Sequence, residues 1–287
     1  MPIVRPEHKS SGIRGKTRTR VIFYNPAGAF GHQKGEQYTA PMGCINRKTG
    51  IMKRALVTGA TKGIGRAITR ALAAKGFSLD LVARSESGLR TALQELQEQA
   101  PDNHYRAHTV DLADPGRRND WIAELIQHNP PFSLLVNNAG LYLQGELLQE
   151  DPQQFTRMWQ LNVQAPYELI RALVPAMIQA EKGHVVNICS VASRDPQSES
   201  GSYSATKAAL LSLTRSLRRE LYHKHISVTA ILPGQTWSAS WEGADLPQHR
   251  LMQATDIAQA VVHSWSLAPS AVVEEIVLRP QQGDLGA

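Results

Sequence analysis

Short apolar runs alternate with amphipathic helical stretches from Arg54 to the end of the 287-residue chain. This alternation is typical of repeated βα units, which place parallel strands in one sheet and helices on its two faces. The runs that predict strands are 55–57, 77–83, 104–110, 132–136, 183–189, 227–232 and 275–278. We therefore expect one doubly wound α/β domain of the Rossmann type over 52–287, with a mainly parallel seven-stranded sheet and helices on both faces.

The helices between these runs are marked by an apolar period of three and four residues and by capping signals. Asp114-Pro115 and Asp151-Pro152 are each typical of a helix start, because an acid caps free N–H groups and proline fits the first turn. The predicted helices are 64–75, 89–99, one that begins at 114, 151–180, 203–223 and 255–266.

A glycine-rich loop, Thr58-Gly59-Ala60-Thr61-Lys62-Gly63-Ile64-Gly65, joins the first strand to the first helix. A dinucleotide pyrophosphate binds at this position in such folds, because glycines let the backbone approach phosphates and the helix N-terminus supplies N–H groups and a positive dipole. The spacing is Gly-x3-Gly-x-Gly instead of the commoner Gly-x-Gly-x2-Gly. A turn without a ligand is the alternative, which the strand–loop–helix context disfavours. We assign to cofactor binding Gly59, Thr61, Lys62, Gly63, Ile64 and Gly65.

The end of the second strand, Val82-Ala83-Arg84-Ser85, bears on the choice of cofactor. A site that prefers NAD carries an acid here for the ribose hydroxyls. Arg84 and Ser85 stand there instead, with Lys62 in the glycine loop, and this pattern favours a 2′-phosphate and hence NADP(H). The alternative is that Arg84 is a solvated charge at a strand end. Asp80 lies too early in the strand to reach the ribose.

Tyr203 and Lys207 stand four residues apart in a predicted helix, and therefore one turn apart on the same face. An ammonium near a phenol favours the phenolate and draws its pKa from about 10 toward neutrality. A phenol tuned in this way can give a proton to a carbonyl oxygen or take one from an alcohol. The same spacing also arises by chance in surface pairs, so its weight depends on the surrounding residues.

Six motifs in order and spacing resemble the short-chain dehydrogenase/reductase family over residues 53 to about 280. Beside the glycine loop and the Tyr203–Lys207 pair, they are Asn137-Asn138-Ala139-Gly140, Leu161-Asn162-Val163, Ser190 thirteen residues before Tyr203, and Pro233-Gly234. The resemblance implies an NADP(H)-dependent oxidoreductase that interconverts a carbonyl and a secondary alcohol by hydride transfer. It also suggests a homotetramer or homodimer built on the helices that begin near Pro152 and Tyr203, whose leucines could equally belong to the core.

The resemblance also implies a role for each matched residue. Tyr203 is the general acid or base, Lys207 lowers its pKa and holds the nicotinamide ribose, and Ser190 donates a hydrogen bond to the substrate oxygen. Asn162 anchors a water that links Lys207 to solvent. Asn138 could equally be a structural turn residue, as could Asn137. Further cofactor contacts are expected from Asp111, Leu112, Asn138, Ala139, Gly140, Pro233, Gly234 and Thr236.

The substrate side is predicted less fully. The loop after Pro233-Gly234 is short, which suggests an open pocket lined by Tyr142, Ser190, Trp237 and Trp241. The chain end lacks the Val-Asp-Gly-Gly-like finish of acyl-carrier-protein reductases and looks more like broad-specificity NADP reductases of hydroxy acids, pterins or small ketones. A 3-oxoacyl-[acyl-carrier-protein] reductase, with Arg194 toward an acidic carrier, is one alternative. A catalytically silent NADP-binding regulator or scaffold is another, which the complete set of catalytic residues disfavours.

The net charge of +6 is concentrated near the N-terminus. Residues 1–51 hold nine Lys/Arg and two Asp/Glu, which leaves 22 Lys/Arg and 23 Asp/Glu in 52–287. A nearly neutral body argues against a nucleic-acid partner. We expect 1–51 to be a basic extension, disordered or non-native because of a misplaced start. A targeting peptide and a tail that binds nucleic acid or membrane are the alternatives.

Two absences in the sequence complete the expectations. No apolar run approaches the roughly eighteen residues of a membrane span, so we expect a cytoplasmic protein without a membrane partner. Cys44 and Cys189 suggest neither a disulfide framework nor a zinc site, and Cys189 is interpreted as a small buried residue. No metal is expected, and His184, His223 and His225 are interpreted as surface or strand-end residues.

Overall fold

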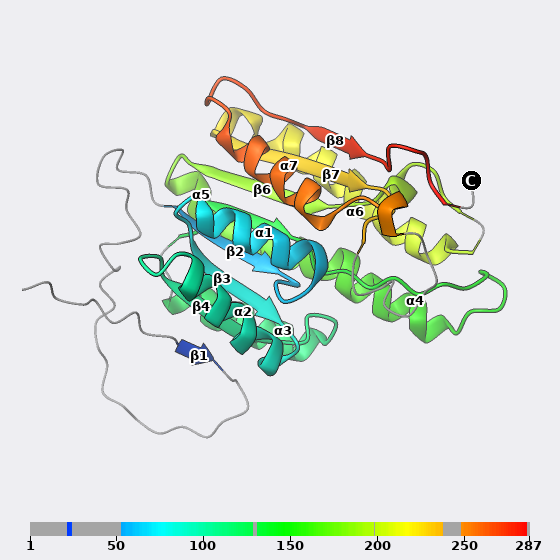
Figure 1. The fold of residues 1–287 in the computed structure, drawn as a ribbon, viewed down its shortest axis with the longest axis horizontal. Helices are drawn as coiled ribbons and strands as arrows, with labels where there is room; N and C mark the ends of the chain where they lie inside the picture. Colours follow the sequence, from blue (N-terminus) through cyan, green and yellow to red (C-terminus); the bar gives the residue numbers. More distant parts are fainter. Residues whose placement is uncertain (1–21, 25–52, 129–130, 198, 238–247, 286–287) are drawn as a thin grey trace, which may run out of the picture.

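The computed structural model describes residues 22–24, 53–128, 131–197, 199–237 and 248–285. Its centre is an eight-stranded sheet of order β1-β4-β3-β2-β5-β6-β7-β8, in which every neighbouring pair is parallel (Figure 1). The strands are β1 (Ile22–Tyr24), β2 (Arg54–Thr58), β3 (Ser78–Ala83), β4 (Tyr105–Thr109), β5 (Leu134–Asn137), β6 (Gly183–Ile188), β7 (Ile226–Pro233) and β8 (Glu275–Leu278).

The seven predicted strands are therefore confirmed, and β1 adds an eighth at one edge, beside β4. Its sequence, Ile22-Phe23-Tyr24, consists of one β-branched and two aromatic residues, all of which favour strands. The sequence analysis did not predict this strand because three residues are too few to show a period.

Helices cover both faces of the sheet (Figure 1). Ile68, Leu93 and Val261 of α1, α2 and α7 are buried in one core, while Trp121 and Leu169 of α3 and α5 are buried in the core on the other face. The helices are α1 (Gly63–Ala74), α2 (Glu86–Gln99), α3 (Pro115–His128), α4 (Pro152–Trp159), α5 (Ala165–Gln179), α6 (Gly201–Leu221) and α7 (Ala254–Ser266). The predicted doubly wound α/β architecture is confirmed.

The predicted helix 151–180 is interrupted in the structure. α4 ends at Trp159, Gln160–Gln164 form a π-helical turn, and α5 begins at Ala165. Such turns are rare and occur frequently at functional sites. Asn162 lies at the centre of this one. A three- and four-residue apolar period does not reveal a local change of helical geometry, so the sequence predicted one continuous helix.

The strand order reverses at the centre of the sheet, between β2 and β5. These two strands pair Ala55 with Leu134 and Val57 with Val136, and every residue in both is buried. In open α/β sheets, ligands bind in the crevice at the carboxyl ends of the strands where the order reverses. The glycine loop follows β2 and Asn138–Gly140 follow β5, so both segments meet at this crevice.

Candidate active site

The glycine loop is packed tightly against the segment that follows β5. Gly59 and Gly63 have φ angles of +66° and +48°, in the left-handed region that favours glycine. A Cβ on Gly65 would lie 2.1 Å from the Gly59 carbonyl oxygen. Asn138 Nδ2 donates to the Thr58 carbonyl oxygen at 2.8 Å. The glycines at 59, 63 and 65 are therefore required by the backbone geometry of this turn.

The N-terminus of α1 carries no anion of its own. Lys62 caps the helix without a side-chain hydrogen bond, and the first turn contains no Asp or Glu. The first N–H groups of a helix have no partner within it and carry a partial positive charge. This turn can therefore accept a negatively charged group such as a phosphate.

Two exposed cations flank this turn. Neither Lys62 nor Arg84 forms an ion pair with any of the residues that the structure describes. Ser85 caps α2, where its Oγ accepts from the Gly88 N–H at 3.0 Å, so α2 begins at Glu86 and not at Leu89. A Cβ on Gly88 would lie 3.3 Å from Thr61 Cβ, which shows that the start of α2 adjoins the glycine loop.

Asp80 does not reach this region, as predicted. It is 2% exposed and accepts from Arg54 Nη2 at 2.7 Å. Its other oxygen lies 2.8 Å from His108 Nε2. Burial raises the pKa of Asp80, but Arg54 and His108 outweigh it and hold the pKa below its ordinary value. Asp80 therefore belongs to a buried ion pair within the fold.

The loop after β4 is fixed by a buried arginine that the sequence analysis missed. Asp111 Oδ1 accepts from the Ala113 N–H at 3.1 Å, and the Leu112 carbonyl oxygen accepts from Arg118 Nη1 at 2.7 Å. Arg118 also pairs with Glu168 of α5 at 2.6 Å and donates to Gln160 of the π turn at 3.2 Å. Only the contact with a distant helix identifies Arg118, and sequence spacing carries no signal of it.

The four predicted catalytic residues converge where β6 ends and α6 begins. Lys207 Nζ donates to the Ile188 carbonyl oxygen at 2.9 Å and lies 5.9 Å from the centroid of the Tyr203 ring. The Ser190 side chain acts on the Tyr203 phenol and lowers its pKa. Ser190 Oγ accepts from the Ala192 N–H at 3.1 Å.

Asn162 ties the π turn to the same group. Its Oδ1 accepts from the Leu141 N–H at 2.8 Å, and its Nδ2 donates to the Leu141 carbonyl at 2.9 Å and to Thr206 Oγ1 at 3.0 Å. A Cβ on Gly140 would lie 3.4 Å from Lys207 Nζ and 3.5 Å from Asn162 Oδ1. The side chain of Asn162 therefore positions the loop after β5 against α6.

The pKa of Tyr203 contradicts one expectation. Burial raises it to about 12, and the Ser190 side chain offsets only part of this rise. The Lys207 ammonium donates to the Ile188 carbonyl, and burial lowers the pKa of Lys207 itself. The prediction of a pKa near neutrality is wrong for this arrangement. A phenol that stays protonated at neutral pH is a proton donor.

The asparagines after β5 bond to protein groups. Asn137 Nδ2 donates to Asn187 Oδ1 at 2.8 Å, and the N–H groups of Asn138 and Ala139 donate to Thr58 Oγ1 at 3.0 and 2.9 Å. These contacts favour the structural alternative for both asparagine side chains. Thr58 was missed as a site residue, and its only signal is its place directly before the glycine loop.

The segment after β7 rests on the C-terminal part of the chain. Pro233 ends β7, and the Gly234 N–H donates to the Leu278 carbonyl at 2.7 Å. Thr236 is buried, and its hydroxyl donates to the Gly234 carbonyl at 3.0 Å. The Trp237 N–H donates to the Met252 carbonyl at 2.8 Å. Trp241, predicted to line the substrate pocket, lies outside the described residues.

Tyr142 lies directly beside Tyr203. The two rings pack edge to face, with centroids 5.0 Å apart and an interplanar angle of 84°. Tyr142 is 45% exposed, so its ring extends the catalytic group toward solvent. Burial, and then the charge of Glu199, raise the pKa of Tyr142. The predicted place of Tyr142 at the substrate side remains a prediction, which this contact favours.

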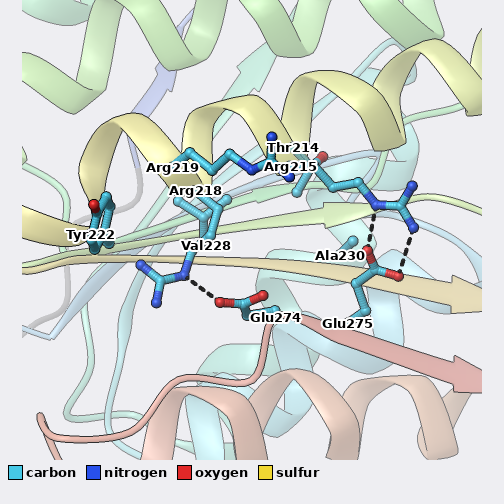
Figure 2. Close-up of a pocket in the computed structure, with 9 residues that line it drawn as sticks. All are labelled: Thr214, Arg215, Arg218, Arg219, Tyr222, Val228, Ala230, Glu274 and Glu275. Atoms are coloured by element: carbon cyan, nitrogen blue, oxygen red, sulfur yellow. Dashed lines mark hydrogen bonds and ion pairs between the residues drawn. The ribbon is translucent and has the colours of Figure 1, made fainter.

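A cavity of about 530 Å³ lies between α6 and the strands β7 and β8, as Figure 2 shows. Its walls are joined by ion pairs from Arg215 to Glu275 at 2.6 Å and from Arg218 to Glu274 at 3.2 Å. Glu275 also accepts from Arg194, which follows the loop of Ser190. None of the predicted site residues lines this cavity.

Two further sequence interpretations can be compared with the structure. His184 is not at the surface: it is 3% exposed, its Nε2 lies 2.8 Å from Thr229 Oγ1, and its ring stacks on Trp265. It sits in β6, which is covered on both faces. Cys189 is free and buried, and burial raises the pKa of its thiol to about 11.

Among the described residues, no three His, Cys, Asp or Glu side chains form a group that could hold a metal ion. Within the same part of the chain, no helix combines the length and apolarity needed to cross a bilayer.

Comparisons with known proteins agree on one family. The sequence profile described as short chain dehydrogenase matches residues 53–246. An uncharacterized oxidoreductase of Staphylococcus epidermidis is 31% identical over 228 residues, which cover 79% of this chain and 97% of that protein. The crystal structure of a metagenomic short-chain oxidoreductase in complex with NADP is similar with a TM-score of 0.69 and 30% identity, over 80% of this chain and 97% of that one. The bulky-bulky ketone specific alcohol dehydrogenase of Comamonas testosteroni has a TM-score of 0.69 and 29% identity, over 78% of this chain and 85% of that one.

Proposed function

The chain belongs to the short chain dehydrogenase family, and from this premise we propose that it is an NADPH-dependent oxidoreductase that interconverts a carbonyl and a secondary alcohol. One observation carries the proposal: the Tyr203 phenol, the Ser190 hydroxyl and the buried Lys207 ammonium meet at the end of β6. This combination supplies a proton donor, a hydrogen-bond donor and a positive charge at a single point. Reduction of a carbonyl requires these groups on the oxygen side of the reacting bond.

The residues present fit NADP(H), which when bound supplies or accepts the hydride. The free N–H groups at the start of α1 and the glycine loop would hold the pyrophosphate. Lys62 and Arg84, exposed and without ion-pair partners among the described residues, suit a 2′-phosphate. The metagenomic relative was solved with NADP. The remaining contacts would come from Ser85, Asp111, Leu112, Asn138, Ala139, Gly140, Pro233, Gly234 and Thr236.

The proton side of the reaction follows from the contacts of the catalytic group. Tyr203 gives its phenolic proton to the carbonyl oxygen as that oxygen gains negative charge. Ser190 donates a second hydrogen bond to the same oxygen, because its own oxygen is held by the Ala192 N–H. Lys207 stabilises the phenolate that remains, and Asn162 keeps the loop after β5 in place. In the oxidative direction each proton moves the opposite way.

The two alternatives receive less support. Arg194, the residue suggested to meet an acidic acyl carrier, is paired with Glu275. A regulator that binds NADP without turnover would not need the complete group of Asn162, Ser190, Tyr203 and Lys207. Both alternatives remain outcomes that the assay below separates.

The proposal is tested by following NADPH oxidation by the purified chain with ketones, β-ketoesters, diketones and an acyl-carrier thioester. We expect turnover of at least one free ketone or β-ketoester, with NADPH preferred over NADH. NADPH binding without turnover across the whole panel would contradict the proposal and favour the regulator. Turnover confined to the thioester would favour the acyl-carrier reductase.

We also propose a homodimer or homotetramer. Leu210 and Leu211 of α6 are buried in the core and do not supply an outer face. Trp159 of α4 and Tyr167 of α5 are instead 36% and 39% exposed, and large apolar residues of this kind favour an interface. Light scattering of the purified chain should give two or four times the monomer mass of 31.6 kDa, and a monomer at micromolar concentration would contradict this.

A further inference from the structure

Two segments held together, residues 141–150 and 199–202, adjoin the group of Tyr203, and we call them the active-site mouth. The Gly145 N–H donates to the Glu199 carbonyl at 2.9 Å, and Gln144 Nε2 donates to a Glu199 carboxylate oxygen at 2.5 Å. The Ser202 hydroxyl donates to the Glu150 carboxylate. Tyr203 follows directly in the chain. The segment that carries the catalytic phenol is therefore anchored through two carboxylates.

These carboxylates carry negative charge close to the reacting group. Glu199 acts on Tyr142 strongly enough to raise its pKa, after the effect of burial. Tyr142 in turn contacts Tyr203 edge to face, with 5.0 Å between ring centroids. The Glu199 charge is thus one aromatic ring away from the phenol that protonates the substrate.

Among the residues that the structure describes, no cation pairs with either carboxylate of the mouth. Within the described residues, neither Glu150 nor Glu199 forms an ion pair, and their partners are the neutral side chains of Ser202 and Gln144. Arg194, five residues before Glu199 in the chain, binds Glu275, and Arg279 lies 2.5 Å from Asp195. Arg279 also binds Asp284. Lys207 is 4% exposed and lies inside the group that contacts the reacting oxygen.

We propose that this site acts on uncharged carbonyl compounds and discriminates against substrates that carry a carboxylate or phosphate near the carbonyl, with Glu199 and Glu150 as the residues that determine this preference. The inference rests on the proposed oxidoreductase function and specifies its substrate class. An anionic substrate would lose its hydration at the mouth and meet two like charges without a compensating cation. Specificity gained by repulsion of the wrong substrate is a common device in binding sites.

The test compares a matched pair of substrates, ethyl acetoacetate and acetoacetate, which share the reacting ketone and differ in charge. At low ionic strength we expect kcat/KM to be about tenfold or more higher for the ester, since two nearby charges each contribute about a threefold to tenfold effect at partly solvated sites. Added salt should reduce the ratio of the two values, because it screens charges at an exposed mouth.

Glu199→Gln and Glu150→Gln identify the cause, because glutamine keeps a hydrogen-bond acceptor and removes the charge. Each variant should lower the ester-to-acid ratio by about threefold or more. Glu220→Gln is the matched control. It removes the same charge from an exposed position on α6, 17 residues and about 25 Å from Tyr203 along the helix, and should leave the ratio unchanged.

Three outcomes would overturn the inference while the proposed function stands. One is turnover of both compounds with acetoacetate the better substrate, and another is a ratio that responds to neither mouth variant. Loss of the difference in Glu220→Gln as well would show a general charge effect and would also overturn it. Absence of turnover with every carbonyl compound would instead contradict the oxidoreductase function, and the inference with it.

Discussion

The N-terminal and C-terminal ends of the parallel strands bury positive charge in different ways. At the N-terminal ends of the strands, Arg54 is 2% exposed and pairs with Asp80 at 2.7 Å. At the C-terminal ends of the strands, Lys207 is 4% exposed. Its ammonium donates to a neutral carbonyl and has no carboxylate partner among the described residues. An ion buried without a counter-ion costs several kcal/mol. The buried charge that only stabilises the fold, that of Arg54, is paired with a carboxylate. The buried charge that we propose serves the reaction, that of Lys207, has no carboxylate partner among the described residues.

The largest expected effect is that of Lys207→Met, which removes the unpaired charge. We expect kcat/KM for a neutral ketone to fall by about 10²–10⁴-fold, because the phenolate formed in the reaction loses its stabilising cation. The midpoint of thermal unfolding should stay the same or rise, since methionine fills similar space without a buried charge. A large fall in thermal stability with activity retained would show that Lys207 is structural and would contradict the role that the comparison gives to its charge.

Asp80→Asn tests the ion pair at the N-terminal ends of the strands. The substitution removes the carboxylate charge that pairs with buried Arg54, so the free energy of unfolding measured in urea should fall by about 3–5 kcal/mol. Turnover per folded molecule should stay within about twofold. Glu95→Gln is the control, because its ion pair with Arg66 is exposed and worth about 1 kcal/mol or less. Equal effects of the two substitutions would remove the distinction between buried and exposed pairs.

The pH dependence of stability extends the comparison to His184, which is buried in its neutral form near the N-terminal ends of the strands. Burial lowers its pKa from 6.5 to about 4. Between these values the unfolded chain binds a proton that the folded chain does not. The contribution of His184 is therefore complete above pH 6.5 and is lost as the pH falls, by up to about 3 kcal/mol.

Urea unfolding of the wild type and of His184→Asn across this pH range measures that contribution. The stability of the variant should fall less steeply toward pH 4, because asparagine does not titrate. Parallel pH profiles for the two proteins would mean that His184 keeps an ordinary pKa in the folded state.

The smallest expected effect concerns Arg84, a second cation at the C-terminal ends of the strands. Arg84 is exposed and forms no ion pair with any of the described residues. Arg84→Ala should lower the preference for NADPH over NADH by about tenfold, as expected for loss of one charge-assisted hydrogen bond to phosphate. Arg90→Ala is the matched control on α2, where Arg90 pairs with Glu86. An unchanged cofactor preference in Arg84→Ala would place the selecting residue elsewhere.

The positions of the proposed catalytic residues could be predicted from the sequence because the topology fixes them. Parallel strands end at one edge, so Ser190 after β6 and the start of α6 must lie near the glycine loop after β2. The offset of Tyr203 from Ser190 and the helical spacing to Lys207 then place the three side chains together.

Other features depend on contacts that chain spacing does not encode. The direction of the Tyr203 pKa shift follows from burial, which a helical spacing does not show. The π turn around Asn162 and the buried position of His184 are set by packing against neighbouring elements. Glu199 reaches Tyr142 only because the loop after β5 folds back onto the start of α6.

The central claim is that Tyr203 donates the proton in a carbonyl reduction driven by NADPH. The most direct measurement is kcat/KM of the wild type and of Tyr203→Phe with the best neutral ketone, accompanied by a binding titration with NADPH. The account predicts that Tyr203→Phe still binds NADPH and loses about 10²–10⁴-fold in kcat/KM. A variant that keeps more than about a tenth of the wild-type value would contradict the account.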